Sequence, residues 1–454
     1  MRRGPGGGGP MPRCDACRIE AEYPEGFVRC GGRGWTLRQW CPPCADRYLT
    51  GLWGLSLTIS GSLLLAGALI SRESGNIWWL RGLLVLGGVL PAGLVAAAVH
   101  VLGHFVVARL TGCEVQRVQI GQWGGRLGRW WFGEMAVEVR TIPLRTSWEV
   151  FPRGDRGLAM RMALVWMGGG LANLTLAVFA GIVAWNSTGG GLQSLWGALW
   201  LVNLVAAAGL IPMHWRYAHR AVWESDGRRL VKDWHRSEAD WGEQRLTQNW
   251  LAADAALEQR DIRVAEKRFR EGMQQVPDDP RGTVGLAMVA LRAGRWMEAR
   301  ALFQEAAGRN RLDDRREPGN GWLLPFVDLL LARPELKGEA ERLSAAEYAR
   351  APWWPEVQAV RGASLVWSGQ TANGLELLRR AEEGASGDRR VIPLVLQAMS
   401  RWFAGDLEEA RRALARAQRV DPQNELLPRV AYQLGEPSPA LPLAGAVTGD
   451  DSLS

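Results

Sequence analysis

Two histidines, His100 and His104, lie four positions apart inside a long apolar stretch. On an α-helix, residues at this spacing share one face, so the two imidazoles could bind one metal ion. Titratable side chains are costly in a membrane-spanning stretch, and there they usually mark a functional site. We therefore predict a metal site at this pair. The plain alternative is a hydrogen-bonded pair of structural histidines.

Cysteines form a second candidate metal site near the N-terminus. Cys14 and Cys17 make one CxxC motif, and Cys41 and Cys44 make another. Each CxxC turn presents two thiolates to one ion, and two turns complete a tetrahedral structural zinc site. Cys30 lies between the pairs and could replace a member of either. This pattern predicts a zinc ribbon over residues 14–48, with ordinary reduced thiols as the alternative.

Four apolar stretches of about 20 residues or more supply the helices that would carry the histidines. Each is long enough to cross a bilayer. They cover about residues 52–70, 83–110, 159–185 and 192–213. The sequence therefore predicts a four-span membrane core over residues 50–235, embedded in a lipid bilayer.

The distribution of arginine predicts the orientation of these spans. Residues 1–49, 111–157 and the chain beyond 213 are rich in arginine, whereas the links at 71–77 and 186–191 are short and nearly uncharged. Positive loops face the cytosol, so both termini and the 111–157 loop are expected there. Within that loop, alternating polar and apolar residues at 114–120 and 135–139 predict short strands or a hairpin.

The C-terminal half shows an internal repeat. The pattern Ala265-x-x-x-Phe269 recurs at Ala299-x-x-x-Phe303, a spacing of 34 residues typical of tetratricopeptide repeats. Weaker copies follow near residues 369 and 405. We predict an α-solenoid over residues 245–435, which either binds a protein partner on its concave surface or acts as a helical spacer.

The spans and repeats together predict a mainly α-helical protein, and the composition does not favour nucleic-acid binding. The net charge of +7 comes almost wholly from arginine, because the chain has only three lysines. We interpret this bias as a codon-composition effect, so no nucleic-acid partner is expected. The N-terminus lacks the apolar segment of a cleaved signal peptide. Residues 1–13 and 436–454 are Gly/Pro-rich and predicted to be disordered.

Several stretches between residues 84 and 232 resemble the site-2 protease family of intramembrane zinc metalloproteases, in the family's order. The segment His100–Arg109 resembles its metal-binding helix. The segment Gly168–Asn173 is similar to its Gly-Pro-x-x-Asn region, with glycine in place of proline. Leu210–Met213 followed by Ser225–Leu230 looks like the motif that supplies the third metal ligand.

The resemblance implies residue roles. His100, His104 and Asp226 would bind zinc, and Asn173 would contact substrate. The family's His-Glu-x-x-His motif places the catalytic general base at the position of Val101, which can neither accept nor donate a proton. Other acids in the sequence could replace it only if they approach in space. In order of preference these are Glu114 and Glu224, then Glu134 and Glu138.

The sequence thus predicts a metal-binding pseudoprotease with no catalytic residue, which holds a transmembrane client or a cytosolic protein through its repeats. An active intramembrane zinc endopeptidase with a displaced base is one alternative. A membrane scaffold without core metal is another. The missing targeting segment and the arginine bias favour a bacterial cytoplasmic membrane.

Overall fold

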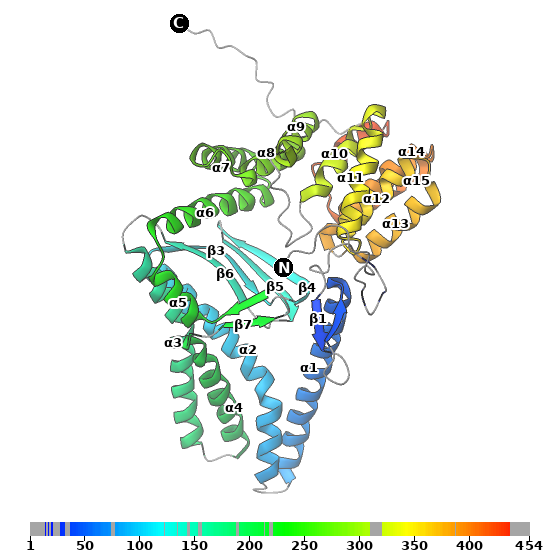
Figure 1. The fold of residues 1–454 in the computed structure, drawn as a ribbon. Helices are drawn as coiled ribbons and strands as arrows, with labels where there is room; N and C mark the ends of the chain where they lie inside the picture. Colours follow the sequence, from blue (N-terminus) through cyan, green and yellow to red (C-terminus); the bar gives the residue numbers. More distant parts are fainter. Residues whose placement is uncertain are drawn as a thin grey trace. The chain divides into compact units, whose positions relative to one another are not determined.

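The computed structural model is mainly helical, with a small sheet and helical repeats (Figure 1). It describes residues 14–435 apart from 15–16, 18–19, 21–27, 32–36, 74–77, 122, 134, 143–145, 153–156, 188–189, 213, 218–220, 309–319 and 386. The expected disorder of residues 1–13 and 436–454 therefore lies outside the described residues. The chain divides into two compact units, residues 44–259 and residues 1–43 with 260–454, and the boundary falls inside the Cys-Pro-Pro-Cys turn.

Four long helices dominate the 44–259 unit, and all four are long and apolar enough to cross a membrane. They are α1 (Pro42–Glu73), α2 (Trp78–Leu110), α3 (Leu158–Asn186) and α4 (Gly190–Ala207), the last followed by a short 3-10 turn, Ala208–Leu210. Many of their large apolar side chains are exposed, because a bundle of four helices cannot bury every face.

Glycines let α2 and α3 approach closely, and this approach brings the histidine face against α3. A Cβ at Gly103 would lie 3.0 Å from the carbonyl carbon of Gly168, and a Cβ at Gly168 would lie 2.8 Å from the oxygen of Gly103. Small residues at a helix crossing allow this backbone contact. Either alanine substitution would therefore push the two helices apart.

The 111–157 loop folds into a four-stranded sheet. Its strands are β3 (Cys113–Ile120), β4 (Trp123–Phe132), β5 (Met135–Ile142) and β6 (Thr146–Pro152), in the order β4-β5-β3-β6. The two predicted strands are confirmed as β3 and β5. They do not form a hairpin with each other but pair in parallel, and β6 pairs antiparallel with β3. The sheet is therefore mixed, because β4 intervenes in the chain between β3 and β5.

One face of this sheet packs on the ends of α2 and α3. Val115, Val118 and Val150 from the strands join Val165 and Trp166 of α3 in a buried apolar cluster. The strands β7 (His214–Tyr217) and β8 (Ala221–Glu224) pair antiparallel. Two helices, α5 (Asp226–Trp234) and α6 (Glu238–Glu258), complete the unit.

The other unit contains the short strands β1 (Val28–Gly31) and β2 (Leu37–Trp40) and a series of helices. The helices are α7 (Ile262–Gln275), α8 (Pro280–Arg292), α9 (Trp296–Gly308), α10 (Leu323–Leu331), α11 (Lys337–Arg350), α12 (Pro355–Trp367), α13 (Thr371–Gly384), α14 (Val391–Phe403), α15 (Leu407–Val420) and α16 (Leu427–Gln433). Short 3-10 turns cover Asn320–Trp322, Pro334–Leu336 and Gly387–Arg390.

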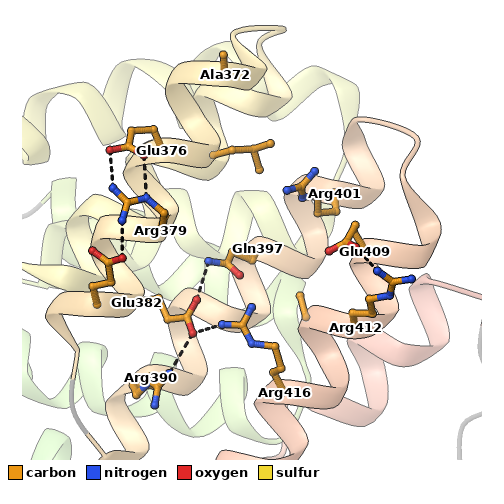
Figure 2. A pocket seen from close by; sticks show the side chains of 13 residues that line it. Ala372, Glu376, Arg379, Glu382, Arg390, Gln397, Arg401, Glu409, Arg412 and Arg416 are labelled. Carbon is orange, nitrogen blue, oxygen red and sulfur yellow. Dashed lines mark hydrogen bonds and ion pairs between the residues drawn. The ribbon is translucent and has the colours of Figure 1, made fainter.

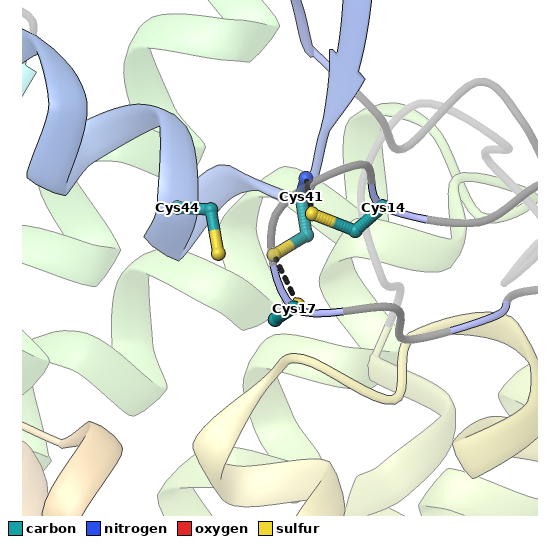
Figure 3. Close-up of side chains that lie close together, drawn as sticks. All are labelled: Cys14, Cys17, Cys41 and Cys44. Carbon is teal, nitrogen blue, oxygen red and sulfur yellow. Dashed lines mark hydrogen bonds between the residues drawn. The ribbon is translucent and has the colours of Figure 1, made fainter.

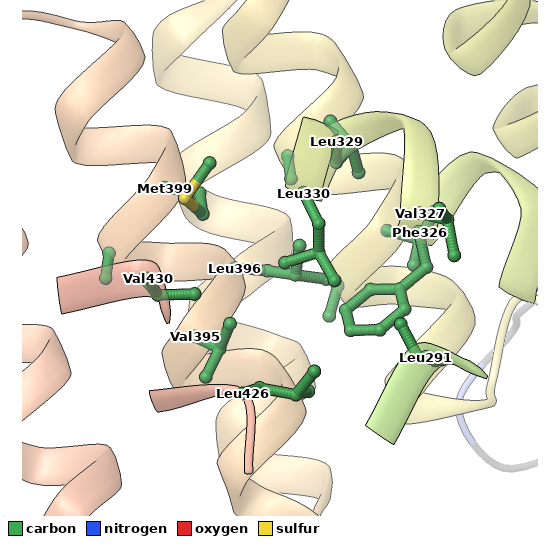
Figure 4. Packing of buried hydrophobic residues seen from close by; sticks show 14 of the residues in the cluster. Leu291, Phe326, Val327, Leu329, Leu330, Val395, Leu396, Met399, Leu426 and Val430 are labelled. Carbon is green, nitrogen blue, oxygen red and sulfur yellow. The ribbon is translucent and has the colours of Figure 1, made fainter. Parts of the chain in front are cut away.

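A continuous apolar core runs between these helices (Figure 4). Phe326, Leu330 and Leu396 are fully buried in it. The repeat residues Ala265, Phe269, Ala299 and Phe303 are buried as well, as the 34-residue pattern requires. Such a core is what stacked helical repeats form, since each pair covers the apolar face of the next.

Candidate metal centre

Three potential ligand atoms meet at the end of α2 where α3 and α5 approach. Nε2 of His100 lies 2.9 Å from Oδ2 of Asp226, and Nε2 of His104 lies 3.3 Å from the same oxygen. The two Nε2 atoms are 3.0 Å apart. Asp226 is more than 120 residues away from the histidines in sequence, so only the tertiary fold brings the three together.

These separations suit a tetrahedral zinc ion. Zinc binds nitrogen and oxygen ligands at about 2.0–2.1 Å, which places ligand atoms of a tetrahedron about 3.3 Å apart. The three observed distances of 2.9–3.3 Å lie close to that value. Three protein ligands leave a fourth position open, as in catalytic zinc sites.

The opposite ring nitrogens of both imidazoles are already occupied. Nδ1 of His104 lies 2.6 Å from the carbonyl oxygen of Val165, which can only accept, so Nδ1 donates to it and Nε2 is the nitrogen that faces Asp226. The His104 ring also stacks on Trp148, with ring centroids 4.3 Å apart. The Asn173 carboxamide contacts Nδ1 of His100 at 3.1 Å. Such secondary contacts orient metal-binding histidines.

A capped helix start positions Asp226. The Ser225 hydroxyl donates to the carbonyl of Ile211 at 2.7 Å and accepts from the backbone N–H of Arg228 at 3.2 Å. Gly227 allows the approach, because a Cβ there would lie 2.9 Å from the carbonyl carbon of Ile211. The end of the α4 segment therefore holds the first turn of α5, which explains why glycine follows the aspartate.

The carboxylate of Asp226 is suited to remain ionised. Burial raises its pKa, but hydrogen bonds and charge interactions with His100 and His104 outweigh burial and hold the pKa below the usual range of aspartate. Two imidazoles and one ionised carboxylate form a donor set that zinc commonly takes. The residues present therefore fit the metal that the sequence predicted.

Two of the acids that the sequence offered as a base in place of Val101 have polar partners other than the histidines. Val101 is partly buried and packs against the apolar cluster between the sheet and the helices. Glu114 accepts a hydrogen bond from Gln248 at 3.2 Å. Glu138 pairs with Arg140 at 2.9 Å. Glu134 and the side chain of Glu224 lie outside the described residues.

A cavity of about 370 Å³ opens beside His100 and Asp226. It is lined by His100, Asn173 and Asp226 of the site, by Trp148, Ser225 and Arg229, and by small or apolar residues of α2 and of α4 with the turn after it. The lining thus combines a few polar groups with a largely apolar wall. This arrangement is typical of pockets that orient a ligand by a few polar contacts.

Sequence reasoning missed several residues that build this site. Trp148, Trp166 and Arg229 surround it, and Gly169 lies directly against both imidazoles. A Cβ at Gly169 would meet Cδ2 of His104 at 2.7 Å and Cε1 of His100 at 2.8 Å. The run of three glycines at 168–170 was the available signal, since such a run in an apolar helix indicates a close approach.

The four predicted cysteines also come together (Figure 3). Their sulfur atoms all lie within 4.8 Å of one another, with Sγ of Cys17 and Cys41 3.6 Å apart. The backbone N–H of Cys41 donates to Sγ of Cys14 at 3.3 Å. Cys44 lies in the first turn of α1, where the helix dipole favours a thiolate. The side chain of Cys30 lies outside the described residues.

The repeats carry a separate, strongly charged groove of about 780 Å³ (Figure 2). It is lined by residues of α13, α14 and α15 and by Arg390. Glu382 accepts hydrogen bonds from Arg390 at 3.0 Å, from Gln397 at 3.1 Å and from Arg416. Arg379 bonds Glu376 at 2.9 Å. Charges of both signs therefore lie in this groove beside the apolar side chains of Ala372, Leu375 and Ala413.

Comparison with known proteins agrees with the repeat architecture. Residues 251–314 match the tetratricopeptide repeat family model, which covers the 34-residue pattern described above. This C-terminal part is therefore composed of tetratricopeptide-like repeats, a class that suggests protein binding. No curated protein matches the chain.

Two solved structures share limited similarity with this chain. One is the crystal structure of YrrB, described as a TPR protein with an unusual peptide-binding site. It is 14% identical, covers 39% of this chain and 88% of its own, and has a TM-score of 0.27. The other is pilF of Pseudomonas aeruginosa, which is 12% identical, covers 61% of this chain and 99% of its own, and has a TM-score of 0.29.

Proposed function

We propose that this protein is a membrane-embedded, metal-binding relative of the site-2 proteases that has lost peptide hydrolysis and serves as a binding protein. The observation that carries the proposal is the convergence of His100, His104 and Asp226 beside a cavity, with Val101 where the family has its base. The four long apolar helices support membrane insertion with both termini in the cytosol.

A zinc ion at this site would act as a Lewis acid toward a ligand oxygen. His100, His104 and Asp226 would hold it, while the Val165 carbonyl and the Asn173 amide orient the two imidazoles. A general base typically contributes about 10²–10⁴ in rate, so a site without one retains ligand binding far better than turnover. Binding without cleavage is therefore the function that these side chains support best.

The repeats would select a protein partner, and the core would bind a transmembrane client. The family match over residues 251–314 supports protein binding by the repeats. The charged groove on α13–α15 is a candidate contact surface, because its arginines and glutamates can pair with charges of the opposite sign on a partner. The cysteine cluster at the start of α1 would be a structural zinc site, separate from the core.

Zinc content per chain tests the proposal. Detergent-purified wild type is expected to hold two zinc ions. His100→Ala/His104→Ala should hold one, and so should Cys14→Ser/Cys17→Ser. One ion in both wild type and the histidine variant would mean that the core binds no metal, and the protein would then be a membrane scaffold.

A further inference from the structure

Arg229 is a cation beside the candidate metal site that has no acidic partner within the described part of the chain. It lies on α5 three residues after Asp226, so the two share a helix face. Its guanidinium does not pair with that carboxylate but lies over the Trp166 ring, 4.9 Å from the centroid. Nearby Arg236, by contrast, pairs with Asp233 at 3.2 Å.

The Trp166 ring holds the Arg229 side chain at the cavity. Trp166 is itself fixed, because its indole N–H donates to Asp233 at 2.7 Å and its ring packs edge-on against Trp148. Arg229 is half-buried and lines the cavity together with His100 and Asp226. Its N–H donors are thus presented near the metal ligands without a protein acceptor among the described residues.

The charge of the cavity is unbalanced. Among the described residues that line it, Asp226 is the one acid, and its carboxylate is engaged by the two histidines. A divalent ion on two neutral imidazoles and one carboxylate leaves a net charge of +1, and Arg229 adds another. Apolar walls strengthen the field of these charges, so the cavity favours an anion.

The rest of the lining favours an anion with an apolar body. Seven of the thirteen described lining residues are small or aliphatic, namely Gly93, Ala96, Ala97, Val202, Val205, Ala206 and Gly209. The Asn173 carboxamide is fully buried at the same cavity, and one of its two polar atoms has no partner among the described residues. That atom is the carboxamide oxygen Oδ1, which accepts hydrogen bonds, so it suits an N–H of the ligand, such as a peptide amide, and not the carboxylate.

We propose that this cavity binds the carboxylate of an apolar ligand, with one carboxylate oxygen near the metal and the other on the guanidinium of Arg229. Arginine and carboxylate match in geometry and charge. The ligand would be the C-terminal carboxylate of an apolar peptide or a fatty acid. This inference rests on the proposed function, because it takes the core metal as given.

Cobalt-substituted, detergent-purified full-length protein provides the test, because Co²⁺ at an open site with nitrogen and oxygen ligands changes its visible spectrum when a ligand binds. The probes are N-acetyl-L-leucine, N-acetyl-L-leucinamide and hexanoate. The variants are wild type, Arg229→Gln and Arg228→Gln. Arg228 is the matched control, since it is the exposed neighbour and keeps its backbone N–H in the substitution.

N-acetyl-L-leucine, hexanoate or both should shift the core cobalt band in wild type and in Arg228→Gln. The concentration needed should rise about 10- to 100-fold in Arg229→Gln, the loss expected for one charge-assisted pair. The acid that binds identifies the source as peptide or fatty acid. Three results would each overturn this inference. They are a response to N-acetyl-L-leucinamide equal to that to N-acetyl-L-leucine, an affinity for the acids in Arg229→Gln equal to that of wild type, and no response to either acid in a cobalt-loaded core. Absence of a core cobalt band in every variant would instead overturn the proposed function.

Discussion

Replacing Gly169 by alanine should selectively empty the core metal site. A Cβ at this position would lie 2.7 Å from Cδ2 of His104 and 2.8 Å from Cε1 of His100, whereas ordinary contact begins at 3.4 Å. The two rings must therefore shift by about 0.6–0.7 Å, and metal–ligand distances tolerate only about 0.2 Å. His104 cannot move freely, because it is bonded to Val165 and stacked on Trp148.

Overpacking of this kind costs about 1–3 kcal/mol, which corresponds to about 5- to 150-fold weaker metal binding. The assay is zinc content after dialysis against a graded series of chelator concentrations, with the cysteine site as an internal reference in the same sample. Gly197→Ala is the matched control, because a Cβ there meets nothing within 4 Å on another apolar helix. Unchanged core zinc affinity in Gly169→Ala would refute the placement of the ion between these histidines.

Three further outcomes follow from single sites. Val101→Glu should cleave detergent-solubilised casein about 10²-fold or more faster than Val101→Gln, because only glutamate supplies a base. Mass spectrometry measures the cleavage, and equal rates in the two variants would contradict the role given to position 101. Burial of Asp328 raises its pKa to about 6 despite its bond to Arg300. The folded state then binds more protons than the unfolded state between about pH 4 and 6, so this residue should lower stability by about 2–3 kcal/mol as pH rises through that window. Thermal unfolding of Asp328→Asn against wild type should show a smaller loss across this range, and parallel curves would rule the effect out. Gly285→Ala should lower the thermal unfolding midpoint of the repeats, because a Cβ would overlap the Phe269 ring. An unchanged midpoint would mean that the ring can move aside.

Local spacing was sufficient to predict the elements that carry the site. The i, i+4 relation of His100 and His104 depends only on helix geometry. The extent of α2 follows from the length of its apolar segment. The repeat pattern at Ala265 and Ala299 is likewise local, since each helix pair packs on its neighbour. The strand periodicity at 114–120 and 135–139 predicted β3 and β5 but not their parallel pairing, which depends on where β4 lies.

The rest of the site depends on contacts between segments that lie far apart in the sequence. Asp226 reaches the histidines because Gly227 and Ser225 attach the start of α5 to the backbone at Ile211. No sequence period encodes that contact. The position of Arg229 over Trp166 is equally non-local, since it depends on the packing of α5 against α3. For this reason the metal ligands could be proposed from motifs, whereas the cavity and its free cation required the structure.

Zinc X-ray absorption of the Cys14→Ser/Cys17→Ser variant tests the central claim most directly, because this variant keeps only the zinc ion of the core site. We expect one zinc per chain with nitrogen and oxygen ligands at about 2.0–2.1 Å, two of them imidazoles, and no sulfur. That spectrum should disappear when His100→Ala/His104→Ala is added. A sulfur-bound ion, or no ion at all in the cysteine variant, would contradict a metal held by His100, His104 and Asp226.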